Sequence, residues 1–177
     1  TLNGDEHHTR QVNASDVEFE LMRIADPANA SPVIAALSNI AGFREFHDRL
    51  KELRETNPSV TQLPAHEQYE AAGPIEGVEV IDDLNLRIVL NQPYPQILYW
   101  FTMPFTTPVP WEAVAYYDGN EGRPNFADHP VGTGPYYMVH YEKQSRIVLE
   151  KNPNWYGVRH PEWKAPGAIY PESGEPD

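Results

Sequence analysis

Hydrophobic side chains recur every three or four residues near the start of the chain, and this spacing predicts a helix. The stripe consists of Val17, Leu21 and Ile24, widened by Phe19 and Met22. Ser15 and Glu18 have the S-x-x-E spacing of a capping box, in which each side chain satisfies a backbone N–H of the first turn. We therefore expect a helix that begins at Ser15 and ends at Asp26-Pro27, because a residue before proline avoids the helical conformation.

A second helical stretch is expected from Ser31-Pro32, a cap residue followed by proline at the first helical position. Its apolar residues keep steps of three or four as far as Leu53. Gly42 interrupts the pattern, which allows either two consecutive helices or one helix kinked at that glycine. Residues 55–77 are polar and punctuated by proline and glycine, and this composition predicts a loop rather than a packed element.

The hydrophobic period then changes to two, which is typical of strands with one buried face. Between residues 77 and 91 the expected buried face carries Leu84, Leu86, Ile88 and Leu90. Asp82-Asp83 provides the expected turn of this hairpin. A second hairpin is expected from residues 136–141 and 146–151, with its turn at residues 143–145.

Prolines separate the remaining segments into short elements. Residues 94–104 and 109–118 are expected to form short helices bounded by prolines, and residues 119–129 to form a surface loop. Helices and strands come in blocks and do not alternate as βαβ units, which disfavours a doubly wound sheet confined to this chain. The pattern therefore predicts the α+β class, with helices and β-hairpins.

Charge and composition exclude several kinds of partner and site. The chain of 177 residues has a formal net charge of −13, and such a field repels nucleic acid and anionic lipid surfaces. It has no cysteine, so it forms no disulfide and no Cys-based metal site. No apolar run approaches the roughly 18 to 20 residues that a membrane-spanning helix needs. We therefore expect no nucleic-acid partner and no membrane insertion of this segment.

The stretch HPVGTGPYYM contains a Gly132-Thr133-Gly134 motif that invites comparison with phosphate-binding loops. Neither G-x-G-x-x-G nor G-x-x-x-x-G-K-[ST] is present, and Pro135 cannot donate an N–H. Two interpretations remain. Gly132, Gly134 and Pro135 form a structural turn that begins a strand at Tyr136, or the amides of this motif form a small nest for a carboxylate.

Aromatic residues supply the other candidate contacts, because their amphipathic faces suit both a core and the wall of a binding cleft. We take Trp100, Thr133, Gly134 and Tyr136 as candidate ligand-binding residues.

No metal site and no catalytic residues are predicted. His7-His8 beside Asp5 and Glu6 is better explained as a solvated terminus than as a metal site, and the sequence contains no G-x-S-x-G motif. We accordingly expect a protein that binds without catalysis and without a cofactor.

Four segments in order resemble one family. They are residues 12–32 (VNASDVEFELMRIADPANASP), 78–95 (VEVIDDLNLRIVLNQPYP), 107–114 (TPVPWEAV) and 129–156 (HPVGTGPYYMVHYEKQSRIVLEKNPNWY). Together they resemble family 5 of the extracellular solute-binding proteins of ABC importers, which includes oligopeptide-, dipeptide- and nickel-binding receptors. The Gly-Thr-Gly-Pro-aromatic turn, followed by a strand and an Asn-Pro ending, is the most specific part of this resemblance.

The resemblance implies a two-lobed receptor that lies outside the cytoplasmic membrane, in the periplasm or extracellularly, and either free or held by a lipid anchor through a missing N-terminus. Such a receptor closes around a peptide or similar solute and delivers it to a membrane permease. Residues 1–125 then correspond to part of a small α+β domain inserted in the first lobe. Residues 126–177 correspond to the chain re-entering the mixed main sheet of that lobe, and the second lobe is expected to be absent.

Two alternatives stay open from the sequence. A sensory or interaction module coupled to a membrane receptor would share the same binding fold. An enzyme on a similar frame would need an active site outside these 177 residues.

Overall fold

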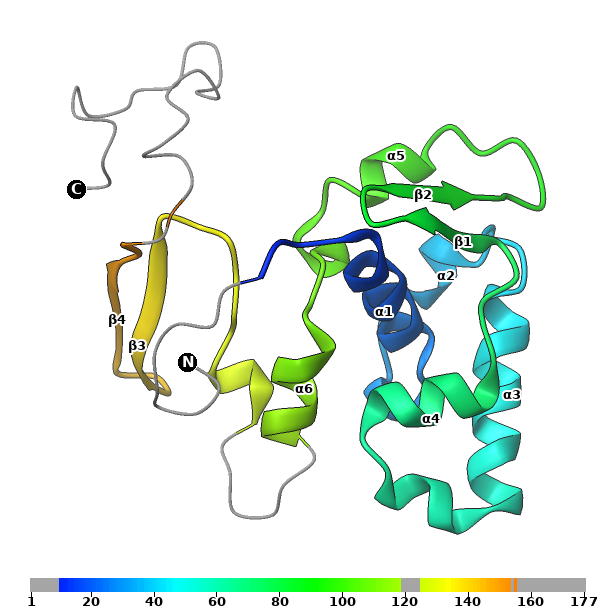
Figure 1. Ribbon diagram of the computed structural model, residues 1–177, viewed down its shortest axis with the longest axis horizontal. Coiled ribbons are helices and arrows are strands. Elements are labelled where there is room, and N and C mark those ends of the chain that lie inside the picture. Colours follow the sequence, from blue (N-terminus) through cyan, green and yellow to red (C-terminus); the bar gives the residue numbers. More distant parts are fainter. Residues whose placement is uncertain (1–9, 119–124, 154, 156–177) are drawn as a thin grey trace. The chain divides into compact units, whose positions relative to one another are not determined.

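The computed structural model describes residues 10–118, 125–153 and 155, which fall into two units, Thr1–Arg123 and Pro124–Asp177 (Figure 1). Helices together with two-stranded antiparallel sheets confirm the α+β class. Within the described residues no larger mixed sheet is formed, so the main sheet of the lobe stays a prediction. His7-His8, most of the expected loop at 119–129 and nearly all of the tail lie outside the described residues.

The first unit contains six described α-helices and one hairpin. The helices are α1 (Ala14–Ala25), α2 (Ile34–Leu37), α3 (Phe43–Thr56), α4 (Ala65–Ala72), α5 (Ile97–Trp100) and α6 (Trp111–Asp118). The strands are β1 (Val78–Asp82) and β2 (Asn85–Ile88). Single 3-10 turns connect several of them, at Pro27–Asn29, Pro58–Gln62 and Pro104–Thr106.

The N-cap of helix α1 lies two residues earlier than the sequence pattern predicts. Its N-cap is Asn13, whose side chain accepts from the Asp16 amide at 3.2 Å, while the Asp16 carboxylate accepts from the Asn13 amide at 3.0 Å. This reciprocal pair is a capping box with the same spacing as the expected Ser15–Glu18 pair. The expected box was therefore wrong: Ser15 lies inside the helix, and its side chain is exposed.

Gly42 separates α2 from α3, which decides between the two alternatives in favour of two helices. Its φ of 74° lies in the left-handed region that glycine tolerates. A Cβ built on Gly42 would lie 2.7 Å from the Glu76 amide nitrogen. The break thus brings the start of α3 into close contact with the segment that leads into β1.

The expected loop at residues 55–77 was wrong, because it contains α4. Eight residues without proline or glycine, Ala65–Ala72, form this helix between Pro64 and Gly73. Burial of Tyr69 and Gln68 makes α4 a packed element. The Gln68 side chain donates to the Leu63 carbonyl at 2.6 Å, which satisfies its buried amide.

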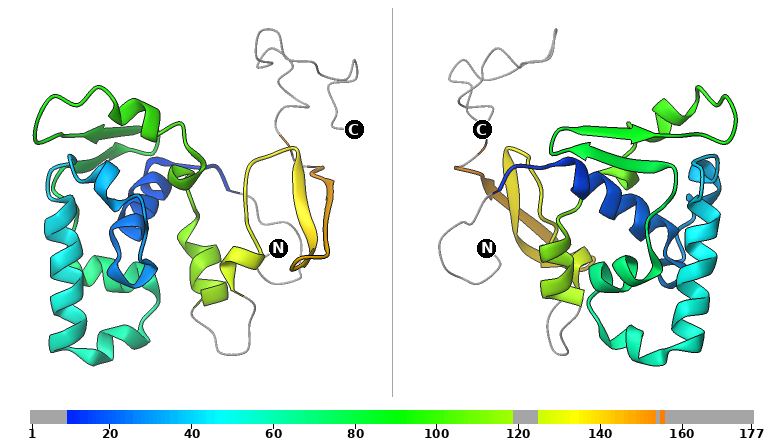
Figure 2. Two further views of the ribbon diagram at one scale, coloured as in Figure 1. Left: turned by 180° about the vertical axis from the view of Figure 1, so that it is seen from behind. Right: turned by 45° about the vertical axis from the view of Figure 1, so that its right-hand side comes forward.

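The core of the first unit lies among α1, α2 and α3, with contributions from the elements around them. Its largest fully buried side chains are Tyr69, Phe43, Phe46, Leu21, Leu37, Ile40, Leu50 and Ile75. The β1–β2 hairpin packs against α1, and Figure 2 shows it from two further sides. Of the stripe predicted on α1, Leu21, Ile24 and Phe19 are buried, whereas Val17 and Met22 are half-buried.

The first hairpin forms, but its turn differs from the prediction. Val78 pairs with Ile88 and Val80 with Leu86, and the turn is made by Asp83 and Leu84. Leu84 is therefore 81 % exposed instead of sharing the buried face. The Asp82 carboxylate accepts from the Leu84 amide at 2.9 Å and so fixes this turn.

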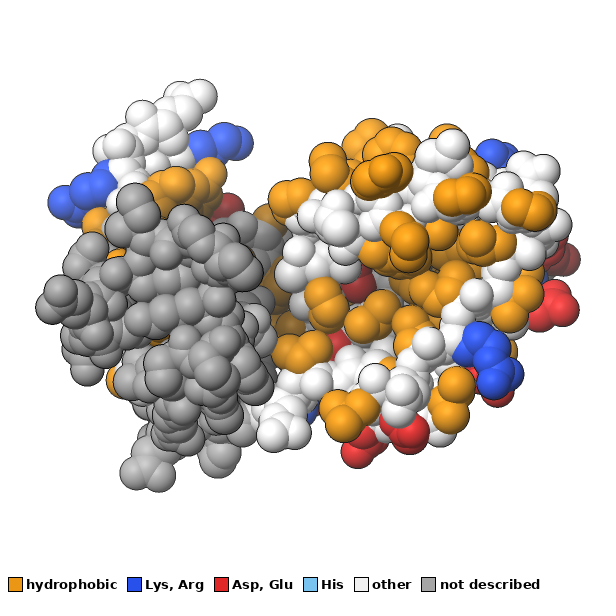
Figure 3. All heavy atoms as spheres, turned by 90° about the horizontal axis from the view of Figure 1, so that it is seen from above, with side chains coloured by type: hydrophobic (Ala, Val, Ile, Leu, Met, Phe, Trp, Pro, Cys, Tyr) orange, Lys and Arg blue, Asp and Glu red, His pale blue; other side chains and the backbone are white. Residues whose placement is uncertain are grey.

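Apolar side chains gather on one face of the first unit, over the β1–β2 hairpin and α5 (Figure 3). The exposed ones in these elements include Ile81, Leu84, Leu98 and Tyr99. The short helices expected at 94–104 and 109–118 are present as α5 and α6.

The second unit contains the hairpin of β3 (Tyr136–Glu142) and β4 (Arg146–Lys151), which confirms the second predicted hairpin. Tyr136 pairs with Lys151 and Glu142 with Arg146, and a register shift lies between Met138 and His140. A 3-10 turn at Phe126–Asp128 precedes it.

Candidate functional site

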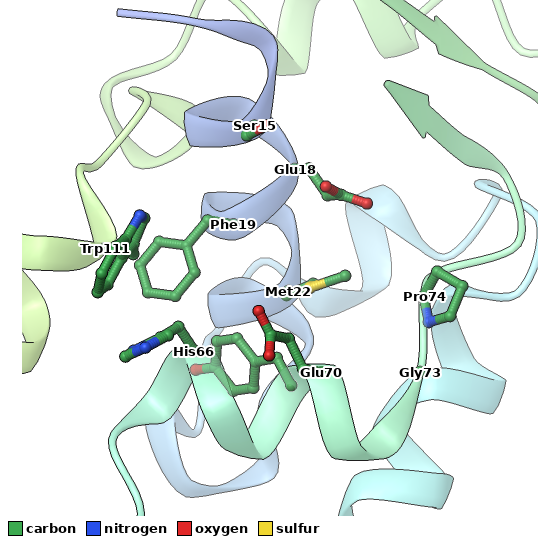
Figure 4. A pocket seen from close by; sticks show the side chains of 10 residues that line it. Ser15, Glu18, Phe19, Met22, His66, Glu70, Gly73, Pro74 and Trp111 are labelled. Atoms are coloured by element: carbon green, nitrogen blue, oxygen red, sulfur yellow. The ribbon is translucent and has the colours of Figure 1, made fainter. Parts of the chain in front are cut away.

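A groove of about 650 Å³ lies between α1 and α4 of the first unit, and we call it the α1–α4 groove. It is lined by Ser15, Glu18, Phe19, Met22, His66, Tyr69, Glu70, Gly73, Pro74 and Trp111. Figure 4 shows side chains from both helices in this space, with Trp111 of α6 near one end and Pro74 near the other. Its volume lies within the range of small-molecule sites, roughly 300 to 1,000 Å³.

Two helix faces with the same spacing form the groove. Ser15, Glu18, Phe19 and Met22 of α1 stand at positions i, i+3, i+4 and i+7. His66, Tyr69, Glu70 and Gly73 repeat these steps on and just after α4. Residues at these steps are neighbours on one side of a helix, so each helix contributes one continuous face.

The floor of the groove rests on a buried hydrogen-bond network. The rings of Phe19 and Tyr69 lie 5.6 Å apart, and the Tyr69 hydroxyl donates to the Asp26 carboxylate at 2.9 Å. Arg54 donates to the same carboxylate through two nitrogens, one of them at 2.9 Å. Burial raises the pKa of Tyr69, and the nearby charge of Asp26 raises it further. The hydroxyl therefore keeps its proton and stays a donor.

Asp26 is the centre of that network. Burial alone would raise its pKa, but the hydrogen bonds from Arg54, the Ala28 amide and Tyr69 outweigh it, and the pKa lies below its usual value. The carboxylate is therefore ionised at neutral pH. It ties the end of α1 to α3 and α4, which fixes the aromatic floor.

Arg10 positions the end of the groove at α6. Its guanidinium donates to Asp16 of α1 at 2.7 Å and to Glu112 of α6 at 2.7 and 2.8 Å. Hydrogen bonds from Arg10 lower the pKa of Glu112. The neighbouring Trp111 is thereby placed against His66, with the two ring centres 4.1 Å apart.

The polar side chains that line the groove have fewer hydrogen-bond partners among the described residues than the network beneath its floor. Burial raises the pKa of Glu18. His66 Nδ1 is buried and has no hydrogen-bond partner among the described residues, an arrangement that costs free energy. Among the described residues no group of three His, Asp or Glu side chains is placed to hold a metal ion. The groove therefore presents apolar side chains and carboxylates, which can contact a ligand.

Trp100, a predicted contact, lies at the end of α5 and outside this groove. Its indole Nε1 donates to the Tyr94 hydroxyl at 2.9 Å, and its ring lies 6.2 Å from that of Phe105. The side chain is half-buried and packs within the first unit. Its role as a ligand contact stays a prediction.

Thr133, Gly134 and Tyr136 occupy one bend of the second unit, just before and at the start of β3. Asn152 fastens this bend from the end of β4: its side chain donates to the Gly134 carbonyl at 3.0 Å and its amide to the Pro135 carbonyl at 2.8 Å. A Cβ on Gly132 would meet no described atom within 4 Å, and one on Gly134 would meet only the Tyr136 carbonyl at 3.8 Å. Neither glycine has a positive φ, so the described residues show no steric need for glycine at this bend.

The α1–α4 groove was missed from the sequence because its second wall was interpreted as a loop. The signal was present, since His66, Tyr69, Glu70 and Gly73 have the spacing of one helix face and no proline interrupts them.

A solved structure with a similar fold identifies the fold class. The chain matches the crystal structure of OppA from Haemophilus influenzae in complex with RPPGFSPFR, with a TM-score of 0.58 and 21 % identity over 90 % of this chain and 26 % of that one. At this identity the likeness concerns the fold, which is that of part of a periplasmic binding protein.

Sequence comparisons identify the family. The family model described as bacterial extracellular solute-binding proteins, family 5 Middle, matches residues 4–166. The chain belongs to this family, as its motifs indicated. It is similar to the periplasmic oligopeptide-binding protein OppA of Escherichia coli, at 29 % identity over 147 residues, which cover 82 % of this chain and 23 % of that protein. It is also similar to di/tripeptide-binding protein 4 of Pseudomonas aeruginosa, at 27 % identity over 86 % of this chain and 24 % of that protein. The chain thus spans about a quarter of the length of these curated relatives.

Proposed function

We propose that the chain is part of the substrate-binding component of an ABC importer, which binds a peptide or similar solute by lobe closure. The family match over residues 4–166 carries this proposal, and the two similar proteins named for oligopeptides and for di- and tripeptides support the class of solute. In this function the protein works outside the cytoplasmic membrane and passes its solute to a permease. None of the described helices is long and apolar enough to span a membrane.

The two units have different places in this proposal. Residues 1–125 form part of the domain inserted in the first lobe, and residues 126–177 return to the main sheet of that lobe. The buried core of the first unit supports its role as a separate domain. The exposed apolar side chains on β3 and β4 support pairing of this hairpin with further strands.

Peptide binding by the whole gene product tests the proposal. Isothermal titration with pools of dipeptides, tripeptides and longer peptides is expected to show saturable binding. X-ray scattering is expected to show a smaller radius of gyration with a bound peptide, because the lobes close. A full-length protein that binds no peptide from any pool would contradict the proposed solute class.

The bend before β3 remains our proposed place of ligand contact, through Thr133, Gly134 and Tyr136, with Trp100 as a further candidate in the first unit. Tyr136→Ala is expected to weaken peptide binding, whereas Tyr141→Ala is a matched control, since these tyrosines of β3 are 39 % and 40 % exposed. Equal peptide affinity of both variants would remove Tyr136 from the proposed site.

A further inference from the structure

Two carboxylates in the α1–α4 groove have no partner of opposite charge among the described residues. Glu18 and Glu70 line the groove, and neither side chain makes a hydrogen bond or an ion pair with any described residue. By contrast, Asp16 and Glu112 are paired with Arg10, and Asp26 is paired with Arg54. Glu18 is half-buried and Glu70 is exposed, and both carboxylates line the groove without a countercharge from a described residue.

No described residue that lines the groove carries a permanently positive side chain. Its lining contains neither lysine nor arginine, and His66 is its one basic group. The ring of His66 is tilted by 40° against that of Trp111, and its Nε2 lies 3.9 Å from a carboxylate oxygen of the neighbouring Glu67. A cation that enters the groove would thus meet two free carboxylates and no fixed competing charge.

The walls beside these carboxylates suit the body of an organic cation. Phe19 and Trp111 present aromatic rings, and Met22 presents a flexible thioether that adapts to irregular shapes (Figure 4). Aromatic faces attract ammonium and guanidinium groups within about 6 Å of the ring centre. In Figure 4 the Glu70 side chain rises from α4 beside Met22, and Glu18 projects from α1 above it.

We propose that the α1–α4 groove binds a small organic cation. Its amine or guanidinium group pairs with Glu18 and Glu70, and its apolar body lies against Phe19, Met22 and Trp111. The volume of about 650 Å³ accommodates a ligand of this size. Charge complementarity selects a cation over a neutral or anionic molecule of the same shape.

Burial of Glu18 supports this assignment. Taking a carboxylate out of water without a countercharge raises its pKa, as happens here, and costs free energy. A bound ammonium would restore the missing interaction. The proposed site lies wholly within the first unit, and it does not depend on whether the whole protein binds peptides.

Three probes of one shape and different charge test the site on the full-length gene product. The probes are 4-phenylbutylamine, the neutral 4-phenylbutan-1-ol and the anionic 4-phenylbutyrate, each titrated calorimetrically at pH 7.5. We expect the amine to bind at least about tenfold more tightly than the alcohol, since a charge-assisted hydrogen bond contributes about 1.5 to 3 kcal/mol. The acid is expected to bind most weakly.

Charge-neutral variants locate the amine. Glu18→Gln and Glu70→Gln are each expected to weaken amine binding about tenfold. Glu55→Gln is the matched control, because it removes one charge from an exposed position of α3 outside the groove. Circular dichroism of each variant verifies that the helices remain.

Several results would overturn the proposal. Equal affinity for amine and alcohol would mean that the groove selects no charge, and no binding of any probe would mean that another part of the protein covers it. Unchanged affinity in both Gln variants would place the amine elsewhere. Competition between the amine and a saturating peptide would contradict a site separate from the peptide site. A protein that binds the amine but no peptide would refute the proposed function and would leave the groove proposal intact.

Discussion

The two units of this chain bury their apolar side chains to very different degrees. In the first unit Phe46 and Leu50 of α3 are fully buried, and a hydrogen-bonded network around Asp26 joins three helices. In the second unit Ile147 and Leu149 of β4 are 61 % and 55 % exposed. The first unit has a core of its own, whereas the described hairpin of the second unit has not.

This difference indicates what each unit needs in order to be stable. A two-stranded hairpin alone is marginal in water, and strands with apolar residues on both faces are typical of covered sheets. Met138 and Tyr141 are paired with Leu149 and Ile147, and neighbouring residues on the opposite face include Val148. We infer that the hairpin is completed by other strands, whereas the first unit folds by itself.

Phe46→Ala is the strongest test of the independent core. The ring is fully buried and packs edge-on against Tyr69 at 5.9 Å, so its removal leaves a cavity. We expect the free energy of unfolding of the 177-residue chain to fall by about 3 to 5 kcal/mol. Urea denaturation followed by circular dichroism at the helical signal measures it. A loss below about 1 kcal/mol would show that this region is not a specific core.

Arg54→Met tests the buried network that supports the groove floor. It leaves the Asp26 carboxylate with Tyr69 and one amide but without its countercharge, and we expect a loss of about 3 kcal/mol. Arg44→Met, at an exposed position of the same helix, is the control and should change stability by less than about 0.5 kcal/mol. Similar losses in both variants would refute a special role for the network.

The same pair predicts a pH dependence. Because the folded-state pKa of Asp26 lies below the unfolded value of 3.8, its contribution is complete above that pH and is lost as the pH falls through the folded pKa. Below pH 4 the wild-type chain should therefore lose more stability than Arg54→Met does.

Glu20→Gln tests an unfavourable feature of the first unit. Burial raises the pKa of Glu20 to about 7, although Arg23, 3.2 Å away, opposes the shift. Because the folded pKa is above the unfolded value of 4.5, the wild-type free energy of unfolding should fall as the pH rises from about 4.5 to about 7. Glu20→Gln should reduce this fall and should be more stable above pH 7 by about 1 to 3 kcal/mol. Glu55→Gln, at an exposed position of α3, is the control and should follow the wild-type dependence of stability on pH. The same dependence in Glu20→Gln would contradict this prediction.

Elements whose period is clear were predictable from the sequence alone. The stripe on α1 indicated a helix because one face of this helix packs against its neighbours. The start of α1 was misplaced because two capping boxes overlap, and only backbone geometry shows that Asn13 and Asp16 form the one in use. Helix α4 was missed because the prolines and glycines around it outweighed its own eight residues.

The candidate site was largely beyond prediction, because it depends on two helices that are distant in the sequence. Glu18 and Glu70 become members of one groove only through the packing of α1 and α4. The Gly-Thr-Gly-Pro motif indicated the family, but among the described residues no atom near the bend explains its glycines. A sequence motif can thus identify a family without explaining its chemistry.

Leu149→Ala is expected to have the smallest effect in this chain and a larger one in the whole gene product. In the 177-residue chain the side chain is 55 % exposed, so we expect a change within about 0.5 kcal/mol. If the hairpin enters a covered sheet, the same truncation in the full-length protein creates a cavity and costs about 2 kcal/mol or more. Parallel urea titrations of both lengths, with Phe46→Ala as the variant expected to be severe in each, separate the two situations. A small effect of Leu149→Ala at both lengths would mean that β4 stays at a surface and that residues 126–177 do not return to a main sheet.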